Sequence, residues 1–177
     1  MKSSTQGYSL YELLVTLAVA ATIIGIGVPS FGALMARTRQ HVELNALFHA
    51  IHLARKESIT KRRVVSLCPS PDGQQCRPDR DWTDGWILFV NADRDSPPHV
   101  DQGEPILDRH TLSPTIRLTA NRRGFTLRGT QLRATNGTLV ACDTHGRVPP
   151  RALVVSYTGR PRVALETPDG EPYACAH

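Results

Sequence analysis

The chain has 177 residues, of which 40% are hydrophobic and 21% charged, and it carries a formal net charge of +5 at pH 7 with a sequence pI of about 9.3. Without its apolar N-terminal segment the chain is the size of one ordinary domain with one core, which excludes a second full-sized domain. The positive net charge favours an anionic partner, either nucleic acid or a membrane surface.

The first predicted element is an uncharged run of nineteen residues, Leu13–Phe31. At 1.5 Å per residue it forms roughly 28 Å of helix, which is enough to span a bilayer. A secretory signal would place several basic residues before a shorter apolar core and a cleavage site after it. Here Lys2 is the only charged residue in the seven residues of the leader, so the segment differs from a secretory signal peptide.

Residues Gly7–Glu12 lead into this run and resemble the class III signal of type IV pilins and pseudopilins, with Tyr8 and Ser9 in place of the usual Phe and Thr. This resemblance implies that a prepilin peptidase cleaves between Gly7 and Tyr8, that the new amine of Tyr8 is methylated, and that the helix is retained. It also implies that Glu12 pairs with the N-terminal ammonium of a neighbouring subunit in the filament. A carboxylate within an apolar span costs on the order of 2.5–3.5 kcal/mol, so Glu12 is a functional candidate; an interfacial, solvated Glu12 is the alternative.

Apolar residues continue at helical spacing beyond Phe31 and predict one helix from about Leu10 to Lys61. Pro29 lacks a backbone N–H and follows two glycines, so we expect the helix to kink or loosen there. His49 and His52 share a face but lack a third ligand, and we interpret them as solvated or rim histidines. The second half of the helix has an apolar stripe of Leu44, Leu47, Phe48, Ile51, Ala54 and Ser58, whereas Arg39, Glu43, Arg55, Lys56 and Lys61 face elsewhere.

Four cysteines, Cys68, Cys76, Cys142 and Cys175, lie downstream of the apolar run and indicate an oxidising compartment such as the periplasm. Four cysteines allow three connectivities, and sequence proximity favours Cys68 with Cys76 and Cys142 with Cys175. The sequence contains no CxxC motif, so neither a zinc site nor thioredoxin-like chemistry is expected.

From Arg63 onward the residue types change to those of short strands separated by turns, which predicts an antiparallel β region. Trp82 and Trp86 flank a Thr-Asp-Gly turn and are expected in the core. Asn136 and Gly137 are typical of a two-residue hairpin turn. The expected strands are 64–68, 87–90, 106–107, 116–119, 124–127, 138–142 and 152–157.

Asn91, Asp93 and Asp95 have the alternating spacing that opens a calcium loop. The sixth position of such a loop is Ser96 rather than Gly, and the twelfth is Gln102 rather than Glu. We therefore interpret this segment as a polar surface loop and expect neither a metal site nor a cofactor.

The segment from Cys68 to Phe89, with Cys76, Trp82 and Trp86 and an acidic tail behind it, resembles the FimT/GspH branch of the pilin superfamily. This resemblance implies an α+β fold in which a long N-terminal helix packs on an antiparallel β domain. It also implies a leader over residues 1–7, a transmembrane or filament-core helix over 8–31, and a periplasmic domain over 32–177. In that domain, residues 32–62 are the amphipathic half of the helix and 63–177 are the β region.

The charged residues of the β region are segregated. Acidic residues outnumber arginines between Val64 and Ser113, whereas between Thr115 and Ala164 there are nine arginines and Asp143 is the single acid. Arginine suits bidentate contacts to phosphate and stacking on bases, and binding through phosphates gives steep salt dependence with little sequence preference. The alternative is that these side chains point outward along strands and are merely solvated. The nine are Arg117, Arg122, Arg123, Arg128, Arg133, Arg147, Arg151, Arg160 and Arg162.

Residues 159–162 read GRPR and follow an apolar strand. Glycine permits a tight turn and proline fixes the chain, so we expect both arginines to project from one loop after the last strand. The tetrapeptide resembles the GRxR motif of FimT proteins, minor pilins tied to DNA uptake, in which the arginines bind DNA. This implies a DNA-binding site with Arg160 and Arg162 as main contacts and Gly159 shaping the loop; Arg147 and Arg151 are weaker candidates.

We therefore expect a minor type IV pilin that binds extracellular double-stranded DNA for uptake during natural transformation. Its expected partners are DNA, other major and minor pilins, prepilin peptidase, and the inner membrane that anchors it by a single pass before assembly into a surface pilus. The alternatives are a structural minor pilin that primes or caps the filament, and a GspH-like pseudopilin of a type II secretion system. No nucleophile elbow, metal-ligand cluster or phosphate loop occurs in the sequence, so we expect no enzymatic activity.

Overall fold

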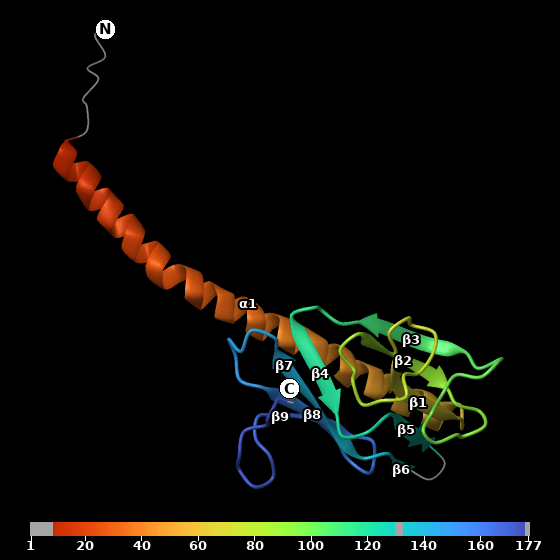
Figure 1. Ribbon diagram of the computed structural model, residues 1–177. Helices are drawn as coiled ribbons and strands as arrows, with labels where there is room; N and C mark the ends of the chain where they lie inside the picture. Colours follow the sequence, from red (N-terminus) through yellow and green to blue (C-terminus); the bar gives the residue numbers. More distant parts are fainter. Residues whose placement is uncertain (1–8, 130–132, 176–177) are drawn as a thin grey trace. The chain divides into compact units, whose positions relative to one another are not determined.

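The structure is a computed structural model that describes residues 9–129 and 133–175. One long helix, α1 (Leu10–Thr60), precedes a β region (Figure 1). The chain divides into two compact units, Met1–Met35 and Ala36–His177, and α1 contributes to both.

The first unit contains the apolar part of α1. Ser9 caps the helix, because its Oγ accepts a hydrogen bond from the Glu12 N–H at 3.2 Å. Ile23 and Ile26 leave 66% and 73% of their surface exposed, and by length and composition α1 is apolar enough to cross a membrane. The helix continues through Pro29, so this proline does not end it, and the expected kink stays a prediction.

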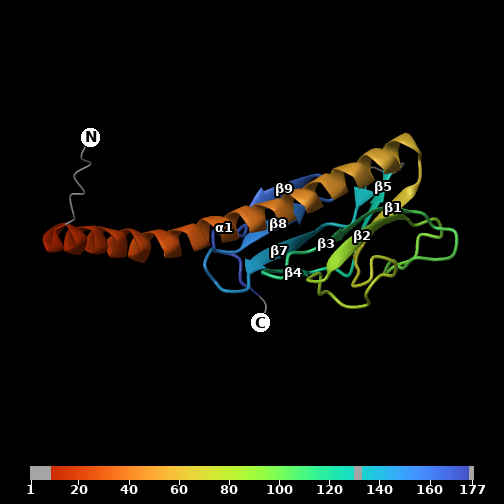
Figure 2. The ribbon, with the colours of Figure 1, turned by 90° about the horizontal axis from the view of Figure 1, so that it is seen from above.

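The described residues of the second unit form two antiparallel sheets. Sheet A has the strand order β3-β2-β1-β5-β6, and sheet B has the order β4-β7-β8-β9. The part of α1 from Ala36 onward lies along the strands of both sheets (Figure 2). The strands are β1 (Val64–Pro69), β2 (Gly85–Val90), β3 (Ile106–Thr111), β4 (Ile116–Ala120), β5 (Phe125–Arg128), β6 (Arg133–Ala134), β7 (Gly137–Asp143), β8 (Arg151–Val155) and β9 (Pro161–Ala164).

The core lies between this part of α1 and the two sheets. The predicted stripe is confirmed, since Leu44, Leu47 and Ile51 are each at most 1% exposed. Trp82 and Trp86 are buried in the same cluster, as predicted. Burial of one large apolar side chain contributes roughly 1.5–3 kcal/mol, so the stripe fixes α1 against the β region. The sheets contribute Leu67, Leu88, Leu118, Phe125, Leu127, Leu139, Leu153 and Val155.

Glu43 was predicted to face away from the core, but it is only 6% exposed. Its carboxylate lies 2.7 Å from His110 Nε2 and accepts a hydrogen bond from the Ser113 N–H at 3.0 Å. These partners compensate the cost of burying a charged group and join α1 to β3 and the loop after it. Helical periodicity could not show this, because both partners lie far away in the sequence.

Two strands, β6 and β9, were not predicted. The prediction that GRPR lies in a loop after the last strand is therefore wrong in part, because Pro161 and Arg162 begin β9. Pro161 and Arg162 interrupt the apolar pattern typical of strands. Proline is tolerated here because β9 is an edge strand and Pro161 is its first residue.

The predicted hairpin turn at Asn136 and Gly137 is also wrong. These residues connect β6 of sheet A to β7 of sheet B, and Gly137 is the first residue of β7. A Cβ atom at position 137 would lie 2.5 Å from Asn121 Oδ1. Glycine is needed at this position because another chain segment passes close by, which the local sequence does not reveal.

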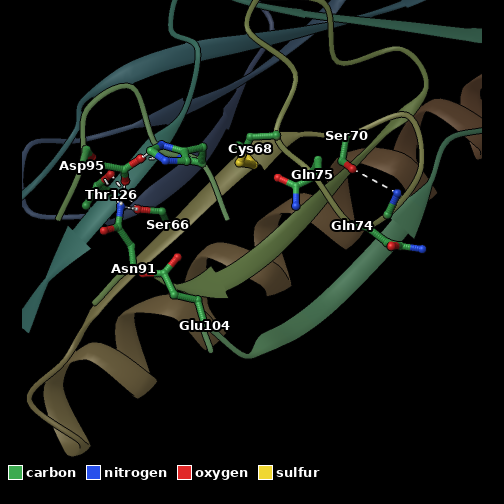
Figure 3. Close-up of a disulfide and its surroundings, with 12 residues drawn as sticks. Ser66, Cys68, Ser70, Gln74, Gln75, Asn91, Asp95, Glu104 and Thr126 are labelled. Atoms are coloured by element: carbon green, nitrogen blue, oxygen red, sulfur yellow. Dashed lines mark hydrogen bonds and ion pairs between the residues drawn. A yellow bond between two sulfur atoms is a disulfide. The ribbon is translucent and has the colours of Figure 1, made fainter. Parts of the chain in front are cut away.

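Two disulfides join Cys68 to Cys76 and Cys142 to Cys175, the pairing that sequence proximity favours. Because side chains alternate along a strand, Cys68 (Figure 3) lies on the face of sheet A opposite Leu67 and the main core. There it packs with Ile87 and Phe89 in a second small cluster. The disulfides thus fix the loop after β1 and the C-terminal segment to the two sheets.

Candidate nucleic-acid interface

The turn between β8 and β9 presents the GRPR residues. The Ser156 N–H donates to the Arg160 carbonyl at 3.0 Å, and the Arg160 N–H donates to Ser156 Oγ at 3.0 Å. Gly159 has φ +72°, and a Cβ atom there would lie 3.1 Å from Leu127 Cδ2 and 3.2 Å from Ala134 Cβ. Glycine is therefore needed here for two reasons: φ is positive, and this turn packs closely against β5 and β6.

Arg160 and Arg162 project from the same face of sheet B. Arg162 lies opposite Val154 in the β8–β9 register, and Arg160 lies opposite Ser156. Leu153 and Val155 face α1 and the core, so alternation places Val154, and with it both arginines, on the opposite face. Two residues apart on an extended chain, their Cα atoms are separated by about 6.6 Å.

Both guanidinium groups are available to a ligand. Arg160 and Arg162 are exposed, and among the described residues neither side chain makes a hydrogen bond or an ion pair. A phosphate that approaches this face therefore meets two arginines whose charges are not compensated by a carboxylate.

Arg151 does not join this pair. It lies opposite Ala141 in the β7–β8 register and shares its face with Leu153, the face directed toward α1. Arg151 is half-buried, whereas Arg162 lies on the exposed opposite face. Arg151 and Arg162, both candidates for DNA binding in the sequence, therefore lie on opposite faces of sheet B.

Arg147 is bound within the protein. Its Nη2 and Nε donate to the Asp143 carboxylate at 2.7 and 3.0 Å, and its backbone N–H donates to the same carboxylate at 2.9 Å. These hydrogen bonds lower the pKa of the Asp143 carboxyl to about 2. We assign Arg147 a structural role, because a phosphate would have to displace a buried carboxylate to bind it.

An arginine and an aromatic ring lie beside the GRPR turn. The Arg133 guanidinium lies 5.5 Å from the centre of the Tyr157 ring, and the Ala134 N–H donates to the Tyr157 carbonyl at 2.8 Å. Tyr157 is 53% exposed. The sequence analysis did not single out Tyr157, and the only available signal was its position two residues before Gly159.

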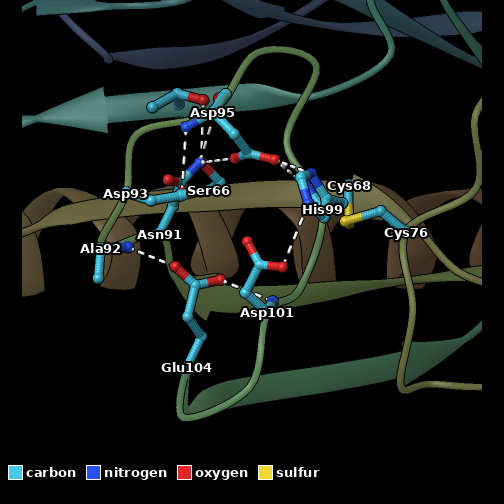
Figure 4. A network of polar contacts seen from close by, with 11 residues as sticks. Ser66, Cys68, Cys76, Asn91, Ala92, Asp93, Asp95, His99, Asp101 and Glu104 are labelled. Atoms are coloured by element: carbon cyan, nitrogen blue, oxygen red, sulfur yellow. Dashed lines mark hydrogen bonds and ion pairs between the residues drawn. A yellow bond between two sulfur atoms is a disulfide. The ribbon is translucent and has the colours of Figure 1, made fainter.

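The loop between β2 and β3 uses its carboxylates internally (Figure 4). His99 Nδ1 contacts Asp95, and its Nε2 lies 3.3 Å from Asp101. The charge of Asp95 raises the pKa of His99, which favours the protonated ring between the two carboxylates. Asn91 donates to Asp95 Oδ1 at 2.8 Å and to Ser66 Oγ at 2.9 Å. The carboxylates of Asp93 and Asp95, which suggested a calcium loop, therefore accept hydrogen bonds within the loop.

The residues predicted for processing, Gly7 and Tyr8, lie outside the described residues. Glu12 is exposed in the first turn of α1. Its proposed pairing with a neighbouring subunit stays a prediction.

Residues 43–159 match the protein family described as type II transport protein GspH. The solved structure of the type IV minor pilin FimU from Pseudomonas aeruginosa has a TM-score of 0.52 and 21% identity, covering 79% of this chain and 97% of that one. The minor pseudopilin EpsH from the type 2 secretion system of Vibrio cholerae has a TM-score of 0.52 and 12% identity, covering 71% and 96% respectively. No curated protein sequence matches the chain. These likenesses confirm the predicted α+β pilin-like fold.

Proposed function

We propose that this chain, which belongs to the GspH family, is a minor type IV pilin of the FimT kind that binds extracellular double-stranded DNA during natural transformation. The observation that carries the proposal is the pair Arg160 and Arg162, exposed on one face of sheet B without a carboxylate partner among the described residues. Their spacing along an extended edge segment suits contacts to neighbouring phosphates of one DNA backbone.

Binding through phosphate contacts depends on charge rather than on base sequence. Contacts to phosphate oxygens position a protein on DNA but carry no direct sequence information. Each neutralised phosphate contributes about −0.9 to the slope of log K against log[salt]. The proposed pilin should therefore hold DNA of any sequence and release it as the salt concentration rises.

The test is a fluorescence titration of the full-length chain in an uncharged detergent with duplexes of unrelated sequences, at about 50 to 200 mM salt. Arg160→Ala and Arg162→Ala should weaken binding to all duplexes equally, and each should reduce the salt slope by about 0.9. Arg109→Ala is the matched control, because Arg109 is also exposed on an edge strand but belongs to sheet A. If the wild type does not bind DNA, or if Arg109→Ala weakens binding as much, the proposal is wrong.

The N-terminal segment is proposed to follow the pilin route of export. Prepilin peptidase would remove residues 1–7, Tyr8 would be methylated, and the helix over 8–31 would anchor the domain 32–177 in the inner membrane until Glu12 guides it into the pilus. Mass spectrometry of the chain co-expressed with a prepilin peptidase should find a methylated N-terminal Tyr8. An intact leader under those conditions would contradict this part of the proposal.

The second candidate is a structural minor pilin or a GspH-like pseudopilin that does not bind DNA. The likeness to the EpsH structure is compatible with either candidate, because the fold is common to both kinds of protein. The titration distinguishes the two candidates, since a purely structural subunit has no reason to bind duplexes in a salt-dependent way.

A further inference from the structure

A hollow with three arginines lies where β4 ends and β5 begins. Its volume is about 300 Å³, and none of the residues that line it is acidic. The lining residues are Arg80, Ser96, Pro97, Pro98, Asn121, Arg122, Arg123, Gly124, Thr126 and Thr135.

The arginines of this hollow carry uncompensated charge. Arg80 and Arg123 are exposed, and their side chains make no hydrogen bond or ion pair within the described part of the chain. Arg122 donates through Nε to the Asn136 carbonyl at 3.0 Å, which leaves its two terminal nitrogens free to donate. The acids beside Arg80 are engaged elsewhere: Asp79 pairs with Arg77 at 3.0 Å, and the carboxylate of Asp81 accepts from the Thr83 N–H at 3.0 Å.

Backbone pairing places this hollow at the same end of sheet B as the GRPR turn. The Arg122 side chain donates to the Asn136 carbonyl, and the next residue, Gly137, lies opposite Val155, which directly precedes Ser156. Ser156 in turn pairs with Arg160. Arg122 and Arg160 are therefore separated by three interstrand spacings of about 4.8 Å, or about 14 Å.

We propose that this hollow is a second phosphate-binding site and that a DNA duplex crosses the end of sheet B from Arg160 and Arg162 to Arg80, Arg122 and Arg123. The inference rests on the proposed function and extends it by giving the direction of the DNA. Duplex DNA carries one charge per about 1.7 Å of axis, so a 14 Å span presents about eight phosphates. One duplex segment can therefore occupy both arginine groups.

The double variant Arg80→Ala/Arg123→Ala tests this inference in the full-length chain in uncharged detergent. Arg122 is retained because its Nε bond holds the loop. Loss of two phosphate contacts should flatten the salt slope by about 1.8 and weaken duplex binding by about 10-fold to 60-fold at 0.1 M salt. Arg80→Lys/Arg123→Lys should keep most of the slope, because the charges remain. Arg109→Ala again serves as the control.

Three outcomes separate this inference from the proposed function. If Arg160→Ala and Arg162→Ala weaken binding while Arg80→Ala/Arg123→Ala leaves affinity and slope unchanged, the second site is refuted and DNA binding stands. If the wild type does not bind duplexes, both proposals fail. If the double alanine variant loses binding to anionic phospholipid vesicles but not to duplexes, the hollow binds lipid headgroups and the inference is overturned. Unchanged tryptophan fluorescence verifies that each variant is folded.

Discussion

Replacing Asp143 by asparagine should destabilise the fold by about 2 kcal/mol at pH 7. The Asp143 side chain is fully buried and accepts three hydrogen bonds from Arg147. These bonds lower the pKa of its carboxyl from 3.8 to about 2. One pKa unit corresponds to about 1.4 kcal/mol, so the ionised carboxylate contributes about 2 kcal/mol to the free energy of unfolding.

The sign of the pH dependence follows from the direction of this shift. Because the pKa is lower in the folded chain, the contribution is fully present above about pH 4 and is lost as the pH falls toward 2. Wild type and Asp143→Asn should therefore differ most near neutral pH, and the difference should shrink in acid.

Urea unfolding of the full-length chain in detergent measures this difference, with the fluorescence of the buried Trp82 and Trp86 as the signal. Asp169→Asn is the control, because Asp169 is exposed and its carboxylate has no partner within the described residues. The control should stay within about 0.5 kcal/mol of wild type. The reasoning is refuted if Asp143→Asn is as stable as wild type at pH 7, or if the difference between them persists unchanged at pH 3.

Three further predictions concern the turn, the helix contact and the loop. Gly159→Ala should cost about 1 kcal/mol or more in urea unfolding and weaken DNA binding, whereas Gly170→Ala, with φ +82° but open space around it, should cost less and leave DNA binding unchanged; equal effects would rule out the packing argument. Glu43→Ala should cost about 1–3 kcal/mol in the same assay, because it removes the buried acceptor of two hydrogen bonds; a cost near zero would contradict the assigned contacts. His99 should titrate above its ordinary pKa of 6.5 by NMR, since Asp95 favours the protonated ring. Backbone amides of the loop between β2 and β3 should exchange faster as the pH rises through the raised pKa of His99. A His99 pKa at or below 6.5 would disprove the ion pair.

The sequence was most informative where the structure is local. Helical spacing predicted the α1 stripe, and residue types predicted the positions of β1, β2, the start of β3, β4, β5, β7 and β8. It failed where a distant partner decides the conformation. Glu43 is buried because His110 and Ser113 meet it, and Gly137 begins a strand because Asn121 passes beside it.

The candidate interface likewise combines features that follow from local sequence with features that depend on distant partners. The resemblance of residues 159–162 to the GRxR motif singled out Arg160 and Arg162, and their role in DNA binding stays a proposal. The alignment of Arg122 with Arg160 depends on strand register across β7 and β8, which a sequence of alternating residues does not specify. The difference between Arg147 and Arg162 depends on whether a carboxylate lies within reach, and Asp143 was counted in the sequence only as an isolated acid.

Ion pairs and strand register within the fold therefore determine how many arginines can contact DNA phosphates. The slope of log K against log[salt] measures that number. If all nine arginines of the basic section contacted phosphates, the slope would be about −8. The structure removes Arg147 by its ion pair and Arg151 by its place on the face toward α1. The proposal uses four of the remaining seven together with one arginine from outside the basic section, and these five contacts give a slope of about −4.5; they are Arg160, Arg162, Arg122, Arg123 and Arg80. A measured slope near −8 would mean that composition alone governs binding, whereas a slope near −2 would restrict the interface to the GRPR turn.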